Sequence, residues 1–313
     1  MQLIMRTKCF LAMVLLWALL LVGCSLNLPQ EGLPEDNLSP VLAVTQTPSI
    51  TVPPLNTPTT WSTRTPLPTF TPSATPPICW KTGGSLEEIE VFSTILDQPV
   101  PLLIYLPPCY TQLPELSYPT LYLIHGQGFT KEQWVEMGMV KLINRWVAIG
   151  DAPPVIIVMP QISEWSEPDS FPFGQALVEE IIPVIEGRYR ALPFREDRKV
   201  GGISRGASWA LHLGLKYWQT FSAIGAHSLP VFYSDAPSLP DWLDAIPADL
   251  RPLISLDYAV SDMSAIRRST DRLIVLLEER SFSYHFFTAP GTHDQEYWKA
   301  NLEEYLQFYL EGW

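Results

Sequence analysis

The sequence predicts an α/β domain built on a doubly wound, mostly parallel sheet with helices on both faces. Seven short apolar runs bounded by turn residues indicate strands. Most are nearly continuous in apolar character, which is typical of strands covered on both faces. From Tyr118 to the end they alternate with segments whose apolar positions recur at helical spacing. This alternation favours a doubly wound sheet that binds ligands at the carboxyl ends of its strands.

The expected elements follow from these patterns. Strands are predicted at residues 100–108, 119–126, 154–160, 198–204, 221–228, 252–259 and 284–290. Helices are predicted at residues 173–189, 207–218, 263–280 and 295–310. Pro183 lies inside the first helix, where it predicts a kink or an early break because proline lacks an N–H and its ring clashes with the preceding turn.

The N-terminal end resembles an export signal. Residues 1–23 contain a short positive segment, an apolar run and a small-residue site, as secretory signal peptides do. The apolar run from Phe10 to Val22 is shorter than the about 20 residues that a membrane span needs. The sequence LVGC, ending at Cys24, resembles the lipobox of bacterial lipoproteins. That resemblance implies acylation of Cys24 and an extracytoplasmic, membrane-anchored protein; a signal peptide with an incidental cysteine is the alternative.

A tether and a single large domain come next in the chain. Residues 24–77 are rich in Pro and Thr and poor in large apolar side chains, so we expect a disordered spacer without a core. Such a spacer reaches roughly 150 Å when extended and about 40 Å as a random coil. Residues 78–313 leave about 235 residues, enough for one α/β domain with a substantial core.

Charge and composition exclude some classes of function. The formal net charge of -13 argues against a nucleic-acid partner, because neutralising phosphates requires clustered Lys and Arg. No HExxH motif or comparable histidine cluster is present. We therefore expect neither a metal nor a cofactor.

Two cysteines remain within the domain, Cys79 and Cys109. Two cysteines in an exported domain are expected to pair, and two buried free thiols are the alternative. The bridge would close a loop of about 31 residues and contribute roughly 3 to 4 kcal/mol by restricting the unfolded chain.

The segment from Gly202 to Gly206 has the GxSxG pattern of a nucleophile elbow, with Ser204 at its centre. A predicted strand leads into it and a predicted helix follows, which is the setting that the elbow of α/β-hydrolases requires. Glycines are needed because side chains would collide with neighbouring backbone in so sharp a turn. The N-terminus of the helix that follows has a partial positive charge, which would stabilise the oxyanion that forms during the reaction. Ser204 is therefore the predicted nucleophile, and a tight turn without chemistry is the alternative.

A serine hydroxyl needs a base and an orienting acid. In α/β-hydrolases these come after the nucleophile in the order acid, then histidine. His293, between the last strand and the last helix, alone meets that order among the five histidines. Asp262 lies beyond a strand end and is the preferred acid, whereas Asp257 falls within the strand and is the alternative. The other histidines are assigned elsewhere: a turn for His125, a structural helix position for His212, a pocket or loop for His227, and a strand interior for His285.

The turn His125-Gly126-Gln127-Gly128 ends another predicted strand. Its glycines allow a backbone N–H to face the serine, so we predict an oxyanion hole made by the amides of Gln127 and Arg205. Gly126 and Gly128 are expected to line the substrate site. Trp134 is a further candidate for substrate contact, with a packed tryptophan as the alternative.

Taken together, LPPCY, YPTLYLIHGQG, EQWVEMG, VIIVMPQ, VGGISRGASWAL, ISLDYAVSD and GTHDQEYW resemble the esterase family related to esterase D. Its relatives include enterochelin, feruloyl and acetylxylan esterases and mycolyltransferases. The resemblance covers nearly everything after Cys79. It implies an α/β-hydrolase fold, ester hydrolysis through an acyl-enzyme, and a triad of Ser204, Asp262 and His293. The substrate would be a small-molecule or polysaccharide-linked ester. Acyl transfer to an envelope sugar or lipid, and a non-catalytic surface binding module, are the alternatives.

Overall fold

The structure is a computed structural model that describes residues 77–163 and 166–313. The predicted signal peptide, Cys24 and nearly all of the predicted tether lie outside these residues. Within the described part, no helix combines the length and the apolar character needed to cross a membrane.

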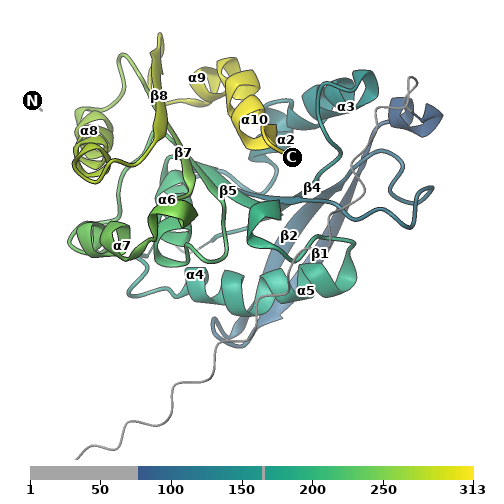
Figure 1. Ribbon diagram of the computed structural model, residues 1–313, viewed down its shortest axis with the longest axis horizontal. Helices are drawn as coiled ribbons and strands as arrows, with labels where there is room; N and C mark the ends of the chain where they lie inside the picture. The colour runs from purple at the N-terminus through teal and green to yellow at the C-terminus, as the bar shows by residue number, and fades with distance from the viewer. Residues whose placement is uncertain (1–76, 164–165) are drawn as a thin grey trace, which may run out of the picture. The chain divides into compact units, whose positions relative to one another are not determined.

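The described residues contain an eight-stranded mixed sheet in the order β1-β2-β4-β3-β5-β6-β7-β8 (Figure 1). Strands β3 to β8 all run parallel to one another, whereas β2 pairs antiparallel with both β1 and β4. The strands are β1 (Ser85–Ser93), β2 (Gln98–Leu106), β3 (Thr120–Ile124), β4 (Ile156–Pro160), β5 (Arg198–Ile203), β6 (Ala223–His227), β7 (Leu253–Ala259) and β8 (Tyr284–Ala289).

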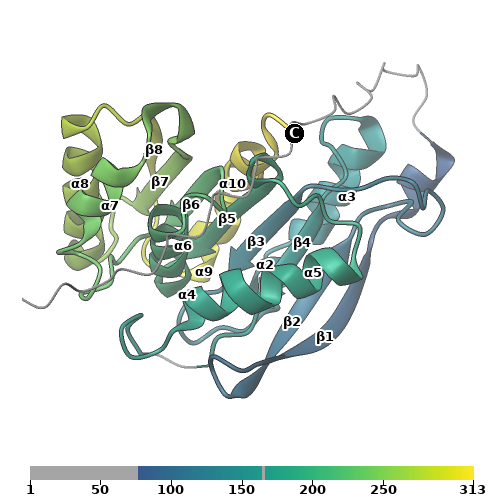
Figure 2. The same cartoon turned by 60° about the horizontal axis from the view of Figure 1, so that its bottom comes forward.

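Helices cover both faces of this sheet (Figures 1 and 2). One face packs against α2 (Gln133–Glu136), α3 (Met139–Ile149), α9 (Gln295–Ala300) and α10 (Leu302–Leu310). The other packs against α4 (Phe173–Ala176), α5 (Ile182–Arg188), α6 (Arg205–Lys216), α7 (Leu239–Ala245) and α8 (Ser264–Glu279). Each face buries its own apolar cluster, which explains why the central strands are apolar on both sides. The predicted fold class is confirmed.

The helical segment around Pro183 is irregular, as its sequence predicts. A wide turn, η2 (Leu177–Ile181), separates α4 from α5, and Pro183 falls in the first turn of α5. The first turn of a helix tolerates a residue without an N–H, because that group would have no partner in the helix. A wide turn just before it gives the proline ring room that a regular helix would deny.

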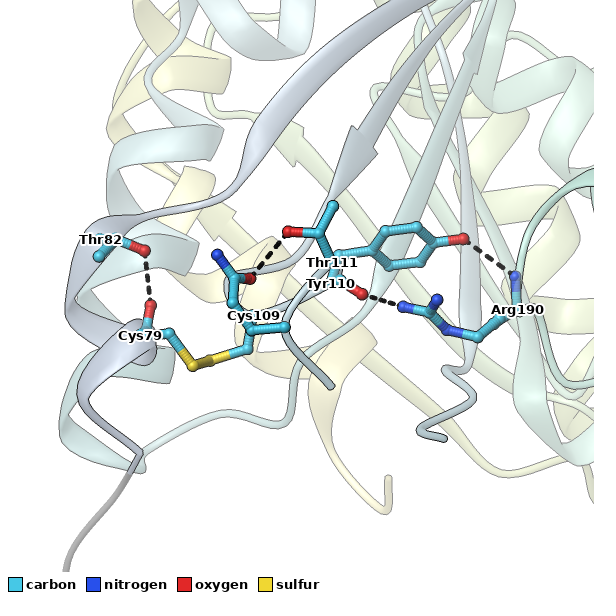
Figure 3. Close-up of a disulfide and its surroundings, with 7 residues drawn as sticks. Cys79, Thr82, Cys109, Tyr110, Thr111 and Arg190 are labelled. Atoms are coloured by element: carbon cyan, nitrogen blue, oxygen red, sulfur yellow. Dashed lines mark hydrogen bonds between the residues drawn. A yellow bond between two sulfur atoms is a disulfide. The ribbon is translucent and has the colours of Figure 1, made fainter. Parts of the chain in front are cut away.

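A disulfide joins Cys79 to Cys109 and fastens the start of the domain (Figure 3). Cys79 lies in the short helix η1 (Ile78–Thr82), and Cys109 lies in the loop after β2. Their Cα atoms are 5.2 Å apart, a normal separation for a disulfide. The adjacent Tyr110 accepts a hydrogen bond from the Arg190 backbone N–H at 3.1 Å, and the Arg190 guanidinium lies 3.9 Å from the Tyr110 ring centre. The bridge therefore ties η1 to a loop that is itself anchored.

Replacing both cysteines by serine should lower the free energy of unfolding by about 3 kcal/mol, because the unfolded chain regains the freedom of the closed loop. Urea denaturation of the double variant and the wild type measures the difference. Reductant should destabilise the wild type to the same extent and leave the double variant unchanged. Equal stability of oxidised wild type and double variant would contradict the entropic role.

Candidate active site

Ser204 occupies a strained turn between β5 and α6. Its backbone is left-handed, with φ 53° and ψ −120°. The turn excludes side chains at its flanks: a Cβ on Gly202 would lie 2.1 Å from the Gly206 carbonyl oxygen, and one on Gly206 would lie 2.3 Å from the Ile124 oxygen. The Ser204 N–H donates to the His227 carbonyl at 2.8 Å, so the turn is held by the neighbouring strand. The elbow predicted from GxSxG is present in the fold.

The three predicted triad side chains meet in space. Ser204 Oγ lies 2.8 Å from His293 Nε2, and His293 Nδ1 lies 2.9 Å from Asp262 Oδ1. A carboxylate only accepts hydrogen bonds, so His293 Nδ1–H donates to Asp262. Nε2 is then free to accept the Ser204 proton. The arrangement is that of a nucleophile, a base and an orienting acid.

The loop that carries His293 is fixed by the helix after it. Asp294 caps α9 by accepting the Tyr297 backbone N–H at 2.9 Å. The Trp298 ring meets the His293 ring edge-on, with 5.1 Å between centroids. His293 thus projects from a capped helix start, and its side chain is only 15% exposed. Asp294 therefore serves the start of the helix.

Asp262 is a buried carboxylate with a full set of donors. Its side chain is completely inaccessible. It accepts a hydrogen bond from the Met263 backbone N–H at 2.7 Å, in addition to the one from His293. Burial alone would raise the pKa of Asp262, but hydrogen bonds from His293, Ser228 and Met263 and the charge of His293 outweigh it and hold the pKa below its usual value. The carboxyl is therefore ionised at neutral pH.

Asp257, the alternative acid, belongs to a separate buried network. Its Oδ1 lies 2.7 Å from His227 Nδ1, and its Oδ2 accepts from the hydroxyls of Tyr297 at 2.7 Å and Tyr305 at 3.0 Å. His227 Nε2 contacts the Tyr309 hydroxyl at 2.7 Å. Burial, followed by the charge of Asp257, raises the pKa of Tyr297 and of Tyr305, which keeps both hydroxyls protonated as donors. Asp257 therefore has the structural role that its place within the strand predicts. His227 is buried in the same network, so the prediction that it lines a pocket is wrong.

The loop from His125 to Gly128 faces Arg205 across a small surface depression, which Ile162 and Trp209 also line. Among the described residues, neither the Gln127 nor the Arg205 backbone N–H donates to another group. The oxyanion hole made by these two amides stays a prediction. Gly126 and Gly128 line the depression as predicted, and Gly128 has a left-handed φ of 84°.

His125 braces this loop. Its Nε2 accepts the Ile162 backbone N–H at 3.0 Å, which leaves Nδ1 to donate to the Gly126 carbonyl at 2.9 Å. Burial lowers the pKa of His125. A neutral ring supplies the one donor and one acceptor that the contacts need. Gln133 adds a second brace by accepting the Gly126 N–H at 2.8 Å.

The prediction that Trp134 contacts substrate is wrong. Its side chain is fully buried, and its Nε1–H donates to the Ile124 carbonyl at 3.3 Å. Trp134 supports the strand below the site instead, which is the packed alternative. The Arg205 side chain is also engaged, because its guanidinium donates to the Ser166 carbonyl and lies 4.9 Å from the Phe232 ring centre.

The two remaining histidines lie outside this cluster. His212 is buried within α6, with Nδ1 2.9 Å from Asp235, which confirms the structural position predicted for it. His285 lies on the edge strand β8, with Nε2 3.7 Å from Glu304 and its side chain about half exposed.

A family model described as Putative esterase matches residues 93–309. The chain belongs to this esterase family. The match covers more than half of the chain and includes Ser204, Asp262 and His293. The family expected from the sequence motifs is confirmed.

Known esterases are similar to this chain. An endo-1,4-beta-xylanase/feruloyl esterase of Xylanibacter ruminicola is 26% identical over 138 residues, which are 39% of this chain and 18% of that protein. An esterase of Mycobacterium tuberculosis is 32% identical over 122 residues, 36% of this chain and 26% of that protein. The chain thus spans only a small part of either relative. A solved ferulic acid esterase aligns with a TM-score of 0.65 and 24% identity, covering 73% of this chain and 98% of that one, which supports the α/β-hydrolase fold.

Mutation should distinguish the catalytic role proposed for Asp262 from the structural role of Asp257. Asp262→Asn should reduce kcat by about 1,000-fold to 10,000-fold, because the amide cannot hold the His293 ring in its reactive tautomer. Asp257→Asn should instead lower the free energy of unfolding by about 3 kcal/mol, because it removes a buried carboxylate and disrupts its hydrogen bonds with His227 and two tyrosines. Ester hydrolysis and urea denaturation on both variants measure the two effects. If Asp257→Asn were the inactive variant with unchanged stability, the assignment of the acid would be reversed.

Proposed function

We propose that this protein is a serine carboxylic-ester hydrolase that acts through an acyl-enzyme. The single observation that carries the proposal is the 2.8 Å contact between Ser204 Oγ and His293 Nε2, with Asp262 on the other side of the same ring. Membership of an esterase family supports it independently. No cofactor is needed for this chemistry.

The proposed reaction proceeds in two halves. Ser204 Oγ attacks the ester carbonyl carbon while His293 Nε2 accepts its proton. The negative charge on the carbonyl oxygen is met by the backbone N–H groups of Gln127 and Arg205, each worth about 3 kcal/mol of barrier. The imidazolium then protonates the departing alcohol. In the second half His293 takes a proton from water, the hydroxide attacks the acyl-enzyme, and the free acid leaves as Ser204 regains its proton.

Aromatic acyl esters are the proposed substrate class. Two of the similar proteins are named as feruloyl or ferulic acid esterases, and one of them is also a xylanase. The depression beside the predicted oxyanion hole is partly lined by Ile162, whose apolar side chain suits an apolar acyl group. We therefore propose hydroxycinnamoyl esters, free or linked to a polysaccharide.

The test uses the purified domain with methyl ferulate, a chromogenic acetate ester and a fluorophosphonate probe. The wild type should hydrolyse the esters and take up the probe. Ser204→Ala should lose at least about 10,000-fold in kcat and all labelling, because the nucleophile is gone. Ser208→Ala, on the next turn of α6, is the matched control and should retain both.

Each other outcome points to a different function. Labelling that persists in Ser204→Ala would remove the nucleophile assignment. A wild type inert to probe and esters would favour a surface binding module on a hydrolase fold. Transfer of the feruloyl group to an added alcohol in preference to water would favour an acyltransferase that uses the same triad.

We further propose that the protein is extracytoplasmic and is anchored to a bacterial membrane by acylation of Cys24. The LVGC sequence after an apolar run supports an anchor, and the Cys79–Cys109 bridge suits an oxidising compartment. Metabolic labelling with an alkyne fatty acid should mark the wild type in the membrane fraction. Cys24→Ser should lose the label and leave that fraction, whereas label retained by the variant would refute the anchor.

A further inference from the structure

Tyr233 is an exposed aromatic residue in the loop between β6 and α7. Its side chain is 90% exposed, the highest fraction among the exposed large apolar side chains of the described residues. A tyrosine ring left in water holds a large apolar area that a ligand can still bury. Tyr233 is therefore a candidate contact for a molecule outside the fold.

The backbone on either side of Tyr233 is held in place by other elements. The Val231 N–H donates to Ser269 Oγ on α8 at 2.7 Å. Ser234 donates to Glu167 through its backbone N–H and through its hydroxyl, both at 3.2 Å. An exposed ring on such a fixed backbone has little freedom left to lose when it binds a ligand, which favours binding.

The same loop adjoins the predicted oxyanion hole. The Phe232 ring centre lies 4.9 Å from the guanidinium of Arg205, the residue that follows the nucleophile. The Arg205 guanidinium also donates to the carbonyl of Ser166, which precedes Glu167. Both neighbours of Tyr233 are thus tied to segments that contact Arg205, and Arg205 lines the depression. Tyr233 itself does not line the depression, so it lies at the rim.

A polar acceptor accompanies the ring at this rim. Both bonds from Ser234 reach Glu167 Oε2, which leaves Glu167 Oε1 without a hydrogen-bond partner among the described residues. Glu167 is partly exposed. A carboxylate oxygen accepts hydrogen bonds from hydroxyl groups. The rim therefore combines an aromatic face with a free acceptor.

A sugar ring matches this combination. The C–H groups on its face carry partial positive charge and are attracted to the negative face of an aromatic ring. Its hydroxyls can donate to a carboxylate or stay hydrated. A subsite as open as that of Tyr233 suits a group that keeps part of its hydration, whereas a purely apolar group gains more from an enclosed pocket.

We propose that Tyr233 and Glu167 form a subsite for a sugar on the alcohol side of the ester, with Tyr233 stacking on the sugar ring. The preferred substrate is then a sugar-linked ester, whose acyl group occupies the depression while its sugar reaches the rim. This inference rests on the proposed hydrolase function. Tyr233 and Glu167 determine specificity and contact no reacting atom.

The experiment measures kcat/KM of the full-length protein on a feruloylated arabinoxylan oligosaccharide and on methyl ferulate. The ratio of the two values is the readout, because an effect common to both esters cancels. Tyr233→Ala removes the ring and Tyr233→Phe keeps it. Glu167→Gln removes the negative charge at similar size. Phe92→Ala is the matched control, because Phe92 is 60% exposed but lies on the edge strand β1.

Tyr233→Ala should lower the ratio by about 3-fold to 10-fold, the range that one aromatic stacking contact provides. The loss should come from a higher KM for the oligosaccharide, because stacking is made equally in the ground state and the transition state. Methyl ferulate should be hydrolysed within about twofold of the wild-type rate. Tyr233→Phe and Phe92→Ala should keep the wild-type ratio. Glu167→Gln should lower it by about 2-fold to 5-fold, for one weakened hydrogen bond.

A binding measurement checks the contact without turnover. Calorimetric titration of Ser204→Ala with the feruloylated oligosaccharide gives a Kd for the intact ester. Adding Tyr233→Ala to that variant should raise the Kd by the same factor as the KM. The Tm of Tyr233→Ala should match that of the wild type, because the side chain is exposed.

Failure of the subsite is separable from failure of the proposed function. If Ser204→Ala loses hydrolysis of methyl ferulate while Tyr233→Ala keeps the wild-type ratio, the sugar subsite is refuted and the hydrolase stands. An equal loss on both esters in Tyr233→Ala would also refute the subsite, since the ring would then act on the acyl group or on the fold. A wild type that hydrolyses neither ester and takes up no fluorophosphonate would overturn the proposed function and the subsite with it.

Discussion

The parallel register of strands β5 to β8 is the constraint on which the whole site depends. Ile203 pairs with His227, and His227 pairs with Asp257, so the carboxyl ends of three adjacent strands stop at nearly the same level. Residues just beyond those ends are brought to one edge of the sheet although they lie far apart in the sequence. A shift of register by one residue would reverse the side-chain faces and separate Ser204 from both of its partners.

A polar network lies directly beneath this edge, where a sheet would normally bury only apolar groups. Asp257 and His227 are fully buried, and the His227 ring stacks on Tyr305 with 3.6 Å between centroids. Such a pair is costly to desolvate and is tolerated because tyrosine hydroxyls satisfy its remaining atoms. Those tyrosines come from α9 and α10, so the network joins two strands to the helices above them. It thereby fixes α9, whose capped start carries His293.

Local patterns were sufficient to predict the fold and the proximity of Ser204, Asp262 and His293. Ser204 lies in a motif with a fixed setting, and His293 is identified by chain order, so neither needs a long-range contact to be recognised. Strand β1 was not predicted, although its buried Ile89 and Val91 alternate with glutamates, as is typical of an edge strand. Helices α2, α3 and α7 were also missed.

Side-chain roles that depend on distant partners could not be predicted from local patterns. Trp134 is an example, since its sequence position gives no sign that its indole is buried under the Ile124 carbonyl. Ser228 is another, because its partner Trp298 is 70 residues away in the sequence. Neither contact leaves a local periodicity or a motif in the sequence.

Ser204 and Ser228 show how one backbone arrangement serves two purposes. Each is a left-handed serine one residue past a parallel strand, and each extends the ladder by one N–H to carbonyl bond, to His227 and Asp257 respectively. The two turns differ in the chain segment that continues from each. After Ser204 a helix starts at once, with Gly206 allowing the close turn, and the hydroxyl is left reaching the His293 ring. After Ser228 the chain continues without a helix, and the buried hydroxyl oxygen accepts the Trp298 indole N–H at 3.0 Å. Adjacent strand ends thus supply one hydroxyl that is partly exposed beside His293 and one that is fully buried, because a different chain segment continues from each turn.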